Sequence, residues 1–285
     1  MNISSGVLFG LVAMLSWGIA DFFAARAIRR AGVFKTLVWG QAVGLLVLIA
    51  VAFLVGLAVP SFYLVIIILL AGFLNVVACL AFYHGLQVGK VSIVSPVSAS
   101  WVVVTVILSL AFLGENLSRS QAIGVVLTIS GVFLTSFKFR DLLKLRLRNL
   151  ATGAQFAAIS MVAWGVHYIF IDVLVAELGW FLPVLLVKAV TVFSLLMYSG
   201  FANRDISYPR SFVPMVVVVG ILEATAFTAY GAGVASEFTA IVAPVAATFP
   251  VVTILLARIF FKEMVEINQK IGICAVLVGL VLLSI

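Results

Sequence analysis

The chain has 285 residues, of which 65% are hydrophobic and only 9% are charged. A soluble domain of this size presents a charged surface, which so few ionisable side chains cannot cover, so lipid is the expected solvent. A membrane-spanning helix needs roughly 20 apolar residues, and this length holds about ten such helices joined by short loops. The composition predicts an all-α integral membrane protein and leaves no room for a separate soluble domain.

Ten apolar segments are predicted to cross the membrane. They cover residues 5–28, 34–57, 61–87, 91–113, 120–137, 151–175, 180–201, 211–233, 237–260 and 267–285. Glycine and proline residues stand at several boundaries, among them Gly32, Pro60, Gly89 and Gly179, where helices are expected to begin or end. The first segment has no basic residue before it and no clear cleavage site, so we interpret it as a retained helix rather than a signal peptide.

Residues 138–150 form the most polar stretch and lie at the centre of the chain. Six of them are ionisable: Lys138, Arg140, Asp141, Lys144, Arg146 and Arg148. Because apolar spans flank it, this segment is predicted to be a basic connector at the membrane surface. Basic loops retained at the cytoplasmic face, together with anionic lipid, account for the net charge of +7, and nucleic acid is not an expected partner.

The segments on the two sides of the connector, residues 1–137 and 151–285, repeat each other. Trp17-Gly18 recurs as Trp164-Gly165, 147 positions later. At an offset of 148, the matching residues include Pro96 with Pro244, Glu115 with Glu263, Gln121 with Gln269, Gly124 with Gly272 and Gly131 with Gly279. So many matches at nearly one offset indicate an internal repeat. Each repeat holds five predicted spans, and because five is odd, the second must enter the membrane from the opposite side. Such inverted-topology repeats are the architecture of many secondary transporters.

The charges of the loops predict which side the chain ends face. The loop lysines and arginines belong to the odd-numbered loops, counted from the N-terminus, except Arg119, which lies in an even-numbered loop. Because loops rich in lysine and arginine are retained in the cytoplasm, both termini are predicted to lie outside. The predicted location is therefore the cell membrane, as a multi-pass protein.

The repeated residues also resemble a known family. Trp17-Gly18, Pro96 and Leu113-Gly114-Glu115, with their counterparts Trp164-Gly165, Pro244 and Lys262-Glu263, are similar to the EamA-like branch of the drug/metabolite transporter superfamily. The resemblance covers essentially the whole chain. It implies a ten-helix carrier of metabolites, amino acids or drugs, whose cavity is formed mainly by the first, third and fourth spans and their counterparts. Many such proteins resemble a model with both termini inside, whereas the loop charges here favour the reverse.

Ionisable side chains inside apolar spans are costly, so each one is a candidate for a binding site. Glu223 lies early in the eighth span, which is otherwise almost uncharged, and is the first candidate. Asp21 lies one turn from Trp17 on the same helical face, where it could accept a proton or a cation beside an aromatic wall. Alternatively, Asp21 pairs with Arg26 or with a neighbouring helix.

The other cation inside a span and the repeated stripe of polar and aromatic residues complete these candidates. Lys188 could pair with Glu223 or with Asp172, which is a simpler interpretation than binding a substrate carboxylate. Tyr230 follows Glu223 by seven residues on one face, and Phe82 stands in the same relation to Asn75. This pattern fits a pocket wall, and it also fits a helix-packing seam.

Two more aromatic residues, one histidine and two prolines are candidates. Trp101 stands in a stripe of small hydroxyl residues, is too large for close packing there, and is expected to face the cavity. Trp164 and His167 share a face, although a lone histidine is more often a hydrogen-bonded packing residue than a proton relay. Pro96 and Pro244 each free a carbonyl four residues back, which binds substrate or simply permits a kink.

The sequence contains no motif of a hydrolase, zinc protease, P-loop or dinucleotide-binding protein, so no catalytic residue, metal or cofactor is predicted. The predicted function is secondary transport, with export as the expected direction, of a small metabolite, amino acid or drug-like solute through a cavity between the repeats. Protons are a candidate coupling ion through Glu223 or Asp21, and membrane lipids are expected partners. The alternative is a lipid-handling or other intramembrane protein without solute transport. Substrate and oligomeric state stay open.

Overall fold

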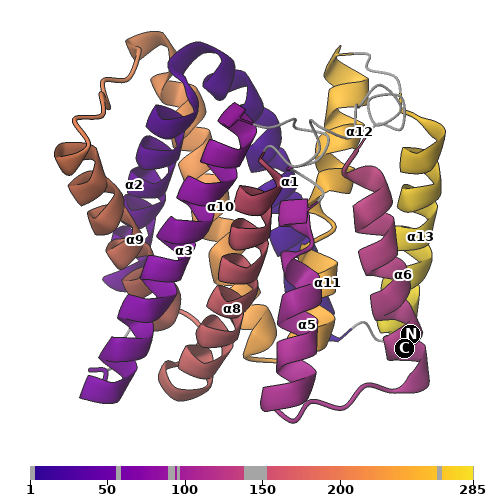
Figure 1. Ribbon diagram of the computed structural model, residues 1–285. Helices are drawn as coiled ribbons and strands as arrows, with labels where there is room; N and C mark the ends of the chain where they lie inside the picture. The colour runs from indigo at the N-terminus through magenta and orange to yellow at the C-terminus, as the bar shows by residue number, and fades with distance from the viewer. Residues whose placement is uncertain are drawn as a thin grey trace.

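The computed structural model describes residues 4–55, 59–88, 94, 97–137, 153–261 and 265–284. In this part of the chain every regular element is a helix, and the helices stand side by side in a bundle (Figure 1). The first half contains α1 (Ser5–Ala31), α2 (Val33–Ala52), α3 (Phe62–Val88), α5 (Trp101–Phe112) and α6 (Arg119–Thr135). The second half contains α8 (Ala154–Leu178), α9 (Leu182–Phe201), the short η2 (Arg210–Phe212), α10 (Val213–Val234), α11 (Thr239–Ala246), α12 (Phe249–Phe261) and α13 (Ile267–Leu283).

Seven helical stretches among the described residues are long and apolar enough to cross a bilayer. They are Ser5–Ala31, Val33–Ala52, Phe62–Gly85, Ala154–Leu178, Leu182–Phe201, Arg210–Val234 and Thr239–Phe260. Three shorter apolar helices, Val97–Phe112, Arg119–Thr135 and Ile267–Leu283, lie where the fourth, fifth and tenth spans are predicted. The chain is therefore a multi-pass helical membrane protein, and the count of ten spans stays a prediction.

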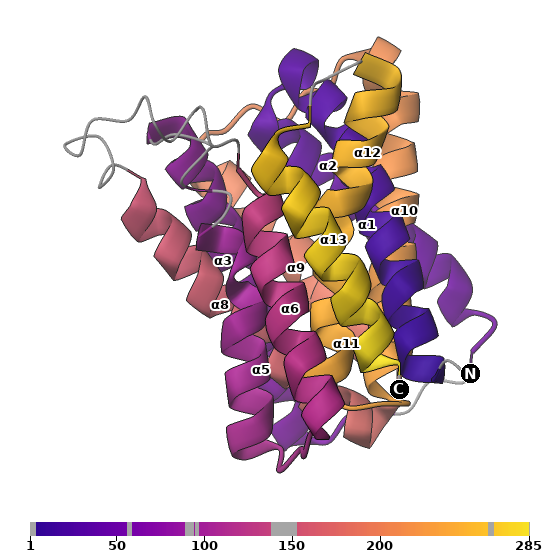
Figure 2. The same ribbon diagram turned by 90° about the vertical axis from the view of Figure 1, so that its right-hand side faces the viewer.

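The two ends of the bundle differ in the segments that they hold. The first residues of α1 and the last residues of α13 lie at one end, which we call the terminal end (Figures 1 and 2). The C-terminal end of α6 and the N-terminal end of α8 lie at the opposite end, which we call the connector end (Figure 2). The predicted connector, residues 138–150, falls outside the described residues.

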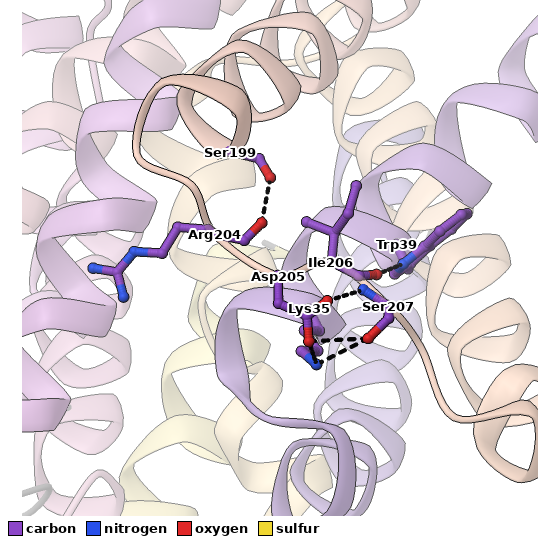
Figure 3. A network of polar contacts seen from close by, with 7 residues as sticks. All are labelled: Lys35, Trp39, Ser199, Arg204, Asp205, Ile206 and Ser207. Carbon is purple, nitrogen blue, oxygen red and sulfur yellow. Dashed lines mark hydrogen bonds and ion pairs between the residues drawn. The ribbon is translucent and has the colours of Figure 1, made fainter.

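Basic side chains gather at the connector end. Of the described lysines and arginines, the helix ends and loops on that side hold Arg26, Arg29, Arg30, Lys35, Arg204, Arg210, Arg258 and Lys270. At the terminal end the only lysine or arginine among the described residues is Arg119, which begins α6. The ion pair between Lys35 and Asp205 also lies on the connector side, where the loop after α9 contacts α2 (Figure 3).

Glycines let α6 and α13 approach until their backbones touch. A Cβ added at Gly131 would lie 2.6 Å from the carbonyl oxygen of Gly272, and one added at Gly272 would lie 2.7 Å from the carbonyl oxygen of Gly131. Gly124 and Gly279 stand in the same relation, each 2.9 Å from the other's carbonyl oxygen. These glycines, which repeat every seven residues, therefore serve close helix contact, as their spacing favours.

The two Trp-Gly dipeptides mark equivalent helix crossings. At Gly18 of α1, an added Cβ would lie 2.5 Å from Cβ of Val252 on α12. At Gly165 of α8, it would lie 2.4 Å from Cβ of Val104 on α5. Each glycine removes the side chain that would hold the helices apart, so the neighbouring tryptophan is held close to the middle of the bundle.

The ninth predicted span, residues 237–260, consists of two helices rather than one. Pro244 lies inside α11, and the helix is interrupted at Ala247 and Thr248 before α12 begins. Proline has no backbone N–H. The carbonyl of Ala240, four residues earlier, therefore lacks its helical hydrogen-bond donor. Pro96, the corresponding residue of the first half, lies outside the described residues.

Candidate functional site

A cavity of about 540 Å³ lies between the two halves, and side chains from both halves line it. Six of the nine side chains predicted to bind substrate or an ion line this cavity: Trp17, Asp21, Asn75, Trp101, Trp164 and Glu223. The lining extends to the connector end, where Thr135, Ser136 and Phe137 follow from α6. A volume of this size suits a small-molecule ligand.

Toward the middle of the bundle the cavity ends on packed aromatic rings, which we call the aromatic cluster: Trp17, Trp101, Tyr168, Phe227, Tyr230 and Phe249. The ring centroids of Trp101 and Tyr168 are 4.3 Å apart, and those of Trp17 and Phe227 are 5.2 Å apart in an edge-on arrangement. Such geometries contribute beyond their buried area. The cluster joins α1, α5, α8, α10 and α12, so it connects both halves at one depth.

Tyr230 belongs to this cluster but does not line the cavity. Its side chain is fully buried, its ring centroid lies 4.8 Å from that of Tyr168, and its hydroxyl has no hydrogen-bond partner among the described residues. The sequence places Tyr230 on the same face of α10 as Glu223, and the structure agrees. Seven residues advance about 10 Å along a helix, however, and this displacement puts Tyr230 on the terminal side of the cavity.

Beyond the aromatic cluster the bundle is closed toward the terminal end. All eight residues of α11 are buried, and the carboxylate of Glu115 accepts hydrogen bonds from the backbone amides of Thr239 (2.7 Å) and Ala240 (2.8 Å). The hydroxyl of Thr239 donates to Asp172, at 2.7 Å. A carboxylate at a helix N-terminus satisfies free amides and opposes the helix dipole. These bonds fix α11 beneath the cluster.

Lys188 and Glu223 form an ion pair that Gln41 bridges. The Lys188 ammonium lies 3.6 Å from the Glu223 carboxylate and donates to the amide oxygen of Gln41 at 2.7 Å, while the Gln41 amide nitrogen donates to Glu223 at 3.4 Å. The ammonium also lies 4.3 Å from the centre of the Phe227 ring. Lys188 is 4% exposed and does not line the cavity, so its ammonium interacts with protein groups and does not face a ligand in the cavity. Among the described residues Lys188 forms no ion pair with Asp172, the other predicted partner, and Asp172 accepts a hydrogen bond from Thr239.

Asn75 and His167 hold α3, α8 and α9 together. The amide of Asn75 donates to the hydroxyl of Thr191 at 3.2 Å, and its oxygen accepts from the Trp164 indole at 3.1 Å. His167 is 1% exposed, and its Nδ1 lies 2.9 Å from the carbonyl oxygen of Ala71. Asn75 and Trp164 also line the cavity, whereas His167 packs behind it.

Asp21 differs from Glu223 in having no hydrogen-bond or ion-pair partner among the residues that the structure describes. Its side chain is exposed and lines the cavity, and within the described part of the chain it makes no hydrogen bond or ion pair. Pairing with Arg26 is therefore not found. A carboxylate that faces a cavity without a partner is free to meet a ligand or a proton.

Several residues of the site are absent from the sequence-based candidates, among them Tyr168, Gln41 and Phe227. Tyr168 contacts Trp17, Trp101, Phe227 and Tyr230 and is the centre of the aromatic cluster. It follows Trp164 by one helical turn, and this spacing could have identified it. Gln41 is an amide inside an apolar span, and its polarity there is a signal that the stripe used to select Asn75 did not cover. Phe227 has no signal that distinguishes it among 23 phenylalanines.

The comparisons with known proteins decide the family. A family model described as the EamA-like transporter family matches residues 4–137 and again residues 151–285. The chain belongs to the EamA-like transporter family. This EamA protein is also similar to the uncharacterized protein MJ1333.1 of Methanocaldococcus jannaschii, with 30% identity over 132 residues, which are 46% of this chain and 96% of that protein. A crystal structure of a protein that is 18% identical superposes with a TM-score of 0.83, covering 100% of this chain and 99% of that one, and shows the same fold.

Proposed function

We propose that this EamA protein is a secondary transporter that moves a small solute through the cavity between its two halves. The observation that carries the proposal is the cavity itself, which both halves line and which stops at the aromatic cluster. A site between two halves can open to either side when the halves rock against each other.

Equivalent contacts in the two halves support an inverted repeat. The hydroxyl of Thr105 donates to the carbonyl of Gly165 at 3.1 Å, and the hydroxyl of Thr253 donates to the carbonyl of Gly18 at 3.0 Å. Thr105 and Thr253 are related by the offset of 148 that relates the halves in sequence. In addition, α1 runs from the terminal end to the connector end and α8 runs the opposite way (Figure 1). This arrangement supports the proposal of ten spans, formed by residues 1–137 and 151–285.

The distribution of charge supports an orientation and a direction. Because basic residues are retained in the cytoplasm, the connector end is proposed to face the cytoplasm and both termini to face outward. The cavity then opens on the cytoplasmic side and is closed by the aromatic cluster and α11 on the outer side. A site that faces the cytoplasm in this conformation is positioned to take up a solute there, which supports export.

Asp21 is better placed for proton coupling than Glu223. Glu223 has a cation and an amide as partners, whereas Asp21 faces the cavity alone. A carboxylate that alternates between a proton and a substrate couples two fluxes without any conformational signal between distant sites. We therefore assign coupling to Asp21, whereas Glu223 is held in its ion pair with Lys188.

Flux through reconstituted protein tests this function. Purified protein in liposomes is screened against a metabolite and drug panel with a pH gradient imposed in either direction. Uptake that depends on the protein, and that Asp21→Asn uncouples from the pH gradient while Glu223→Gln does not, is the expected result. If Asp21→Asn leaves the dependence on the gradient unchanged, the coupling assignment is wrong. If no compound of the panel moves at any gradient, transport itself loses its support.

A space outside the central cavity, with an almost wholly apolar lining, supports the lipid-handling alternative. It has a volume of about 640 Å³ and lies between α1, α2 and α10, with exposed Phe9, Val12 and Trp180 in its lining. Its lining is almost wholly apolar and contains no ionisable residue, so it can hold an acyl chain but offers no group to act on one. Transport through the central cavity accounts for more of the polar residues and is the preferred function.

A further inference from the structure

The charges that line the central cavity are all negative. Asp21 and Glu223 contribute carboxylates, and no lysine, arginine or histidine belongs to the lining among the described residues. A ligand that enters this space leaves most of its water behind, and in a medium of low dielectric a charge needs an opposite charge nearby. The lining therefore discriminates against anions.

Lys188 removes only half of this negative charge. Its ammonium lies behind the cavity wall, 3.6 Å from Glu223, and it stands on the Phe227 ring. Glu223 is thereby neutralised, while Asp21 has no cation within the described part of the chain. One uncompensated carboxylate remains, and one positive charge on a ligand would balance it.

The aromatic walls suit a cation with an apolar body. Nine of the lining residues carry aromatic rings, among them Trp17 of α1 and Phe249 of α12, and Asp21 follows Trp17 by one turn of α1. Ring faces attract ammonium groups through their quadrupole, and indole does so best. Lys188 on Phe227 is an example of this contact a short distance from the cavity.

Acidic residues continue on the far side of the aromatic cluster. Another space at the terminal end, separate from the central cavity and also of about 540 Å³, has Glu115, Asp172, Glu177 and Glu237 in its lining. Glu115 and Asp172 are bonded to α11, whereas Glu177 lies exposed. Carboxylates on both sides of the closure favour a cation along the whole route and disfavour an anion.

We propose that the transported solute is a small organic monocation, an amine or quaternary ammonium with an aromatic or branched apolar body. The cation is held by Asp21 and the apolar body by the aromatic walls. This inference rests on the proposed function for its transport part, while the cation site itself stands on the lining of the cavity.

Three ligands with one body and different head groups test the inference. The probes are trimethyl(2-phenylethyl)ammonium, 3-phenylpropionate and 2-phenylethanol, and their binding to the purified protein is measured by titration calorimetry. The quaternary ammonium keeps its charge at every pH, so the comparison reports the site alone. We expect the ammonium to bind at least about tenfold more tightly than the other two, because pairing of its charge with a buried carboxylate and its contact with aromatic ring faces together contribute about that factor or more. This comparison needs no variant and is not affected by a folding defect.

Matched variants locate the site. Asp21→Asn is expected to weaken binding of the ammonium by roughly 10- to 100-fold. Asp205→Asn, which removes a carboxylate of the loop after α9 that lines neither acidic space, is expected to leave it unchanged. Tighter binding of 3-phenylpropionate, equal binding of the three probes, or no binding of any of them would overturn the inference. Equal binding by Asp21→Asn and wild type would overturn the role of Asp21.

Flux measurements separate this inference from the proposed function. Transport of panel compounds without preference for cations would leave the transporter standing and overturn the substrate class. Preference for the ammonium in binding, without flux in liposomes, would leave the cation site standing and overturn transport.

Discussion

The Lys188 ammonium lies 3.6 Å from the Glu223 carboxylate, but the two groups are buried to different degrees. The side chain of Lys188 is 3% exposed and that of Glu223 is 20% exposed, on the cavity side. Removing one member of a buried ion pair leaves the other without compensation. The two single substitutions therefore have unequal consequences, because only Glu223 can be hydrated when its partner is lost.

Glu223→Gln is expected to destabilise the protein more than Lys188→Met. The first change leaves an ammonium with no counter-charge inside the bundle, at a cost of about 3–5 kcal/mol. The second leaves a carboxylate that the cavity can hydrate. The double variant is expected to recover part of the loss. Thermal unfolding in detergent, followed by circular dichroism, measures the order, and equal losses for the two single variants would contradict it.

We call the contact of α6 with α13 through Gly124, Gly131, Gly272 and Gly279 the glycine seam. Substitution of one of these glycines is expected to destabilise the packing of α6 against α13. Gly131→Ala places a methyl group 2.6 Å from the Gly272 carbonyl oxygen, which requires the backbones to separate, at a cost of about 1–3 kcal/mol. Gly200→Ala is the control, because a Cβ there meets nothing within 4 Å and alanine favours a helix by about 1 kcal/mol. The melting temperature should fall for Gly131→Ala and stay or rise for Gly200→Ala.

Loss of the charged cap on α11 is expected to loosen the closed end. Glu115 is 9% exposed and accepts two backbone amides, and glutamine can accept only with its single oxygen. Glu115→Gln should cost about 1.5–3 kcal/mol, the range for a hydrogen bond to a charged group. Hydrogen exchange of the Thr239 and Ala240 amides measures it, with Glu177→Gln as the control. Unchanged protection of these amides would show that Glu115 does not hold them.

The ion pair at the connector end predicts a dependence on pH. The Lys35 ammonium and the Ser207 amide and hydroxyl, which bond to Asp205, hold the pKa of that carboxyl well below its ordinary value near 3.8 (Figure 3). Because the folded pKa is lowered, the pair stabilises the protein above the ordinary pKa, and this contribution is lost as the pH falls below it. The pair is exposed, so the effect is small and screened by salt.

A pH series tests this pair. The difference in melting temperature between wild type and Asp205→Asn should be present at pH 6, shrink below about pH 4, and shrink at high salt at any pH. A difference that grows as the pH falls from 6 to 3 would have the wrong sign and would exclude the ion pair as its source.

Spacing along a single helix is enough to predict which side chains share a face. Trp17 and Asp21 stand on one face of α1 and both line the cavity, and Trp101 and Trp164 also line it. Pairing between helices was harder, since Lys188 had two possible partners and only the packing of α2, α9 and α10 selects Glu223. Depth was not predictable either. Tyr230 shares a face with Glu223, but its position along α10 relative to the aromatic cluster depends on how α10 is set against α1 and α8.

The backbone contacts of Gly124 and Gly131 with Gly279 and Gly272 restrict how the two halves can move. Sliding α6 along α13 by one turn would bring side chains such as Thr128 or Val276 against a facing carbonyl, where only hydrogen fits. Tilting about the seam requires no such exchange, because the glycines stay opposite one another. The contact between α6 and α13 therefore acts as a hinge beside the cavity. The helices on the opposite side must move furthest when the cavity changes the side to which it opens.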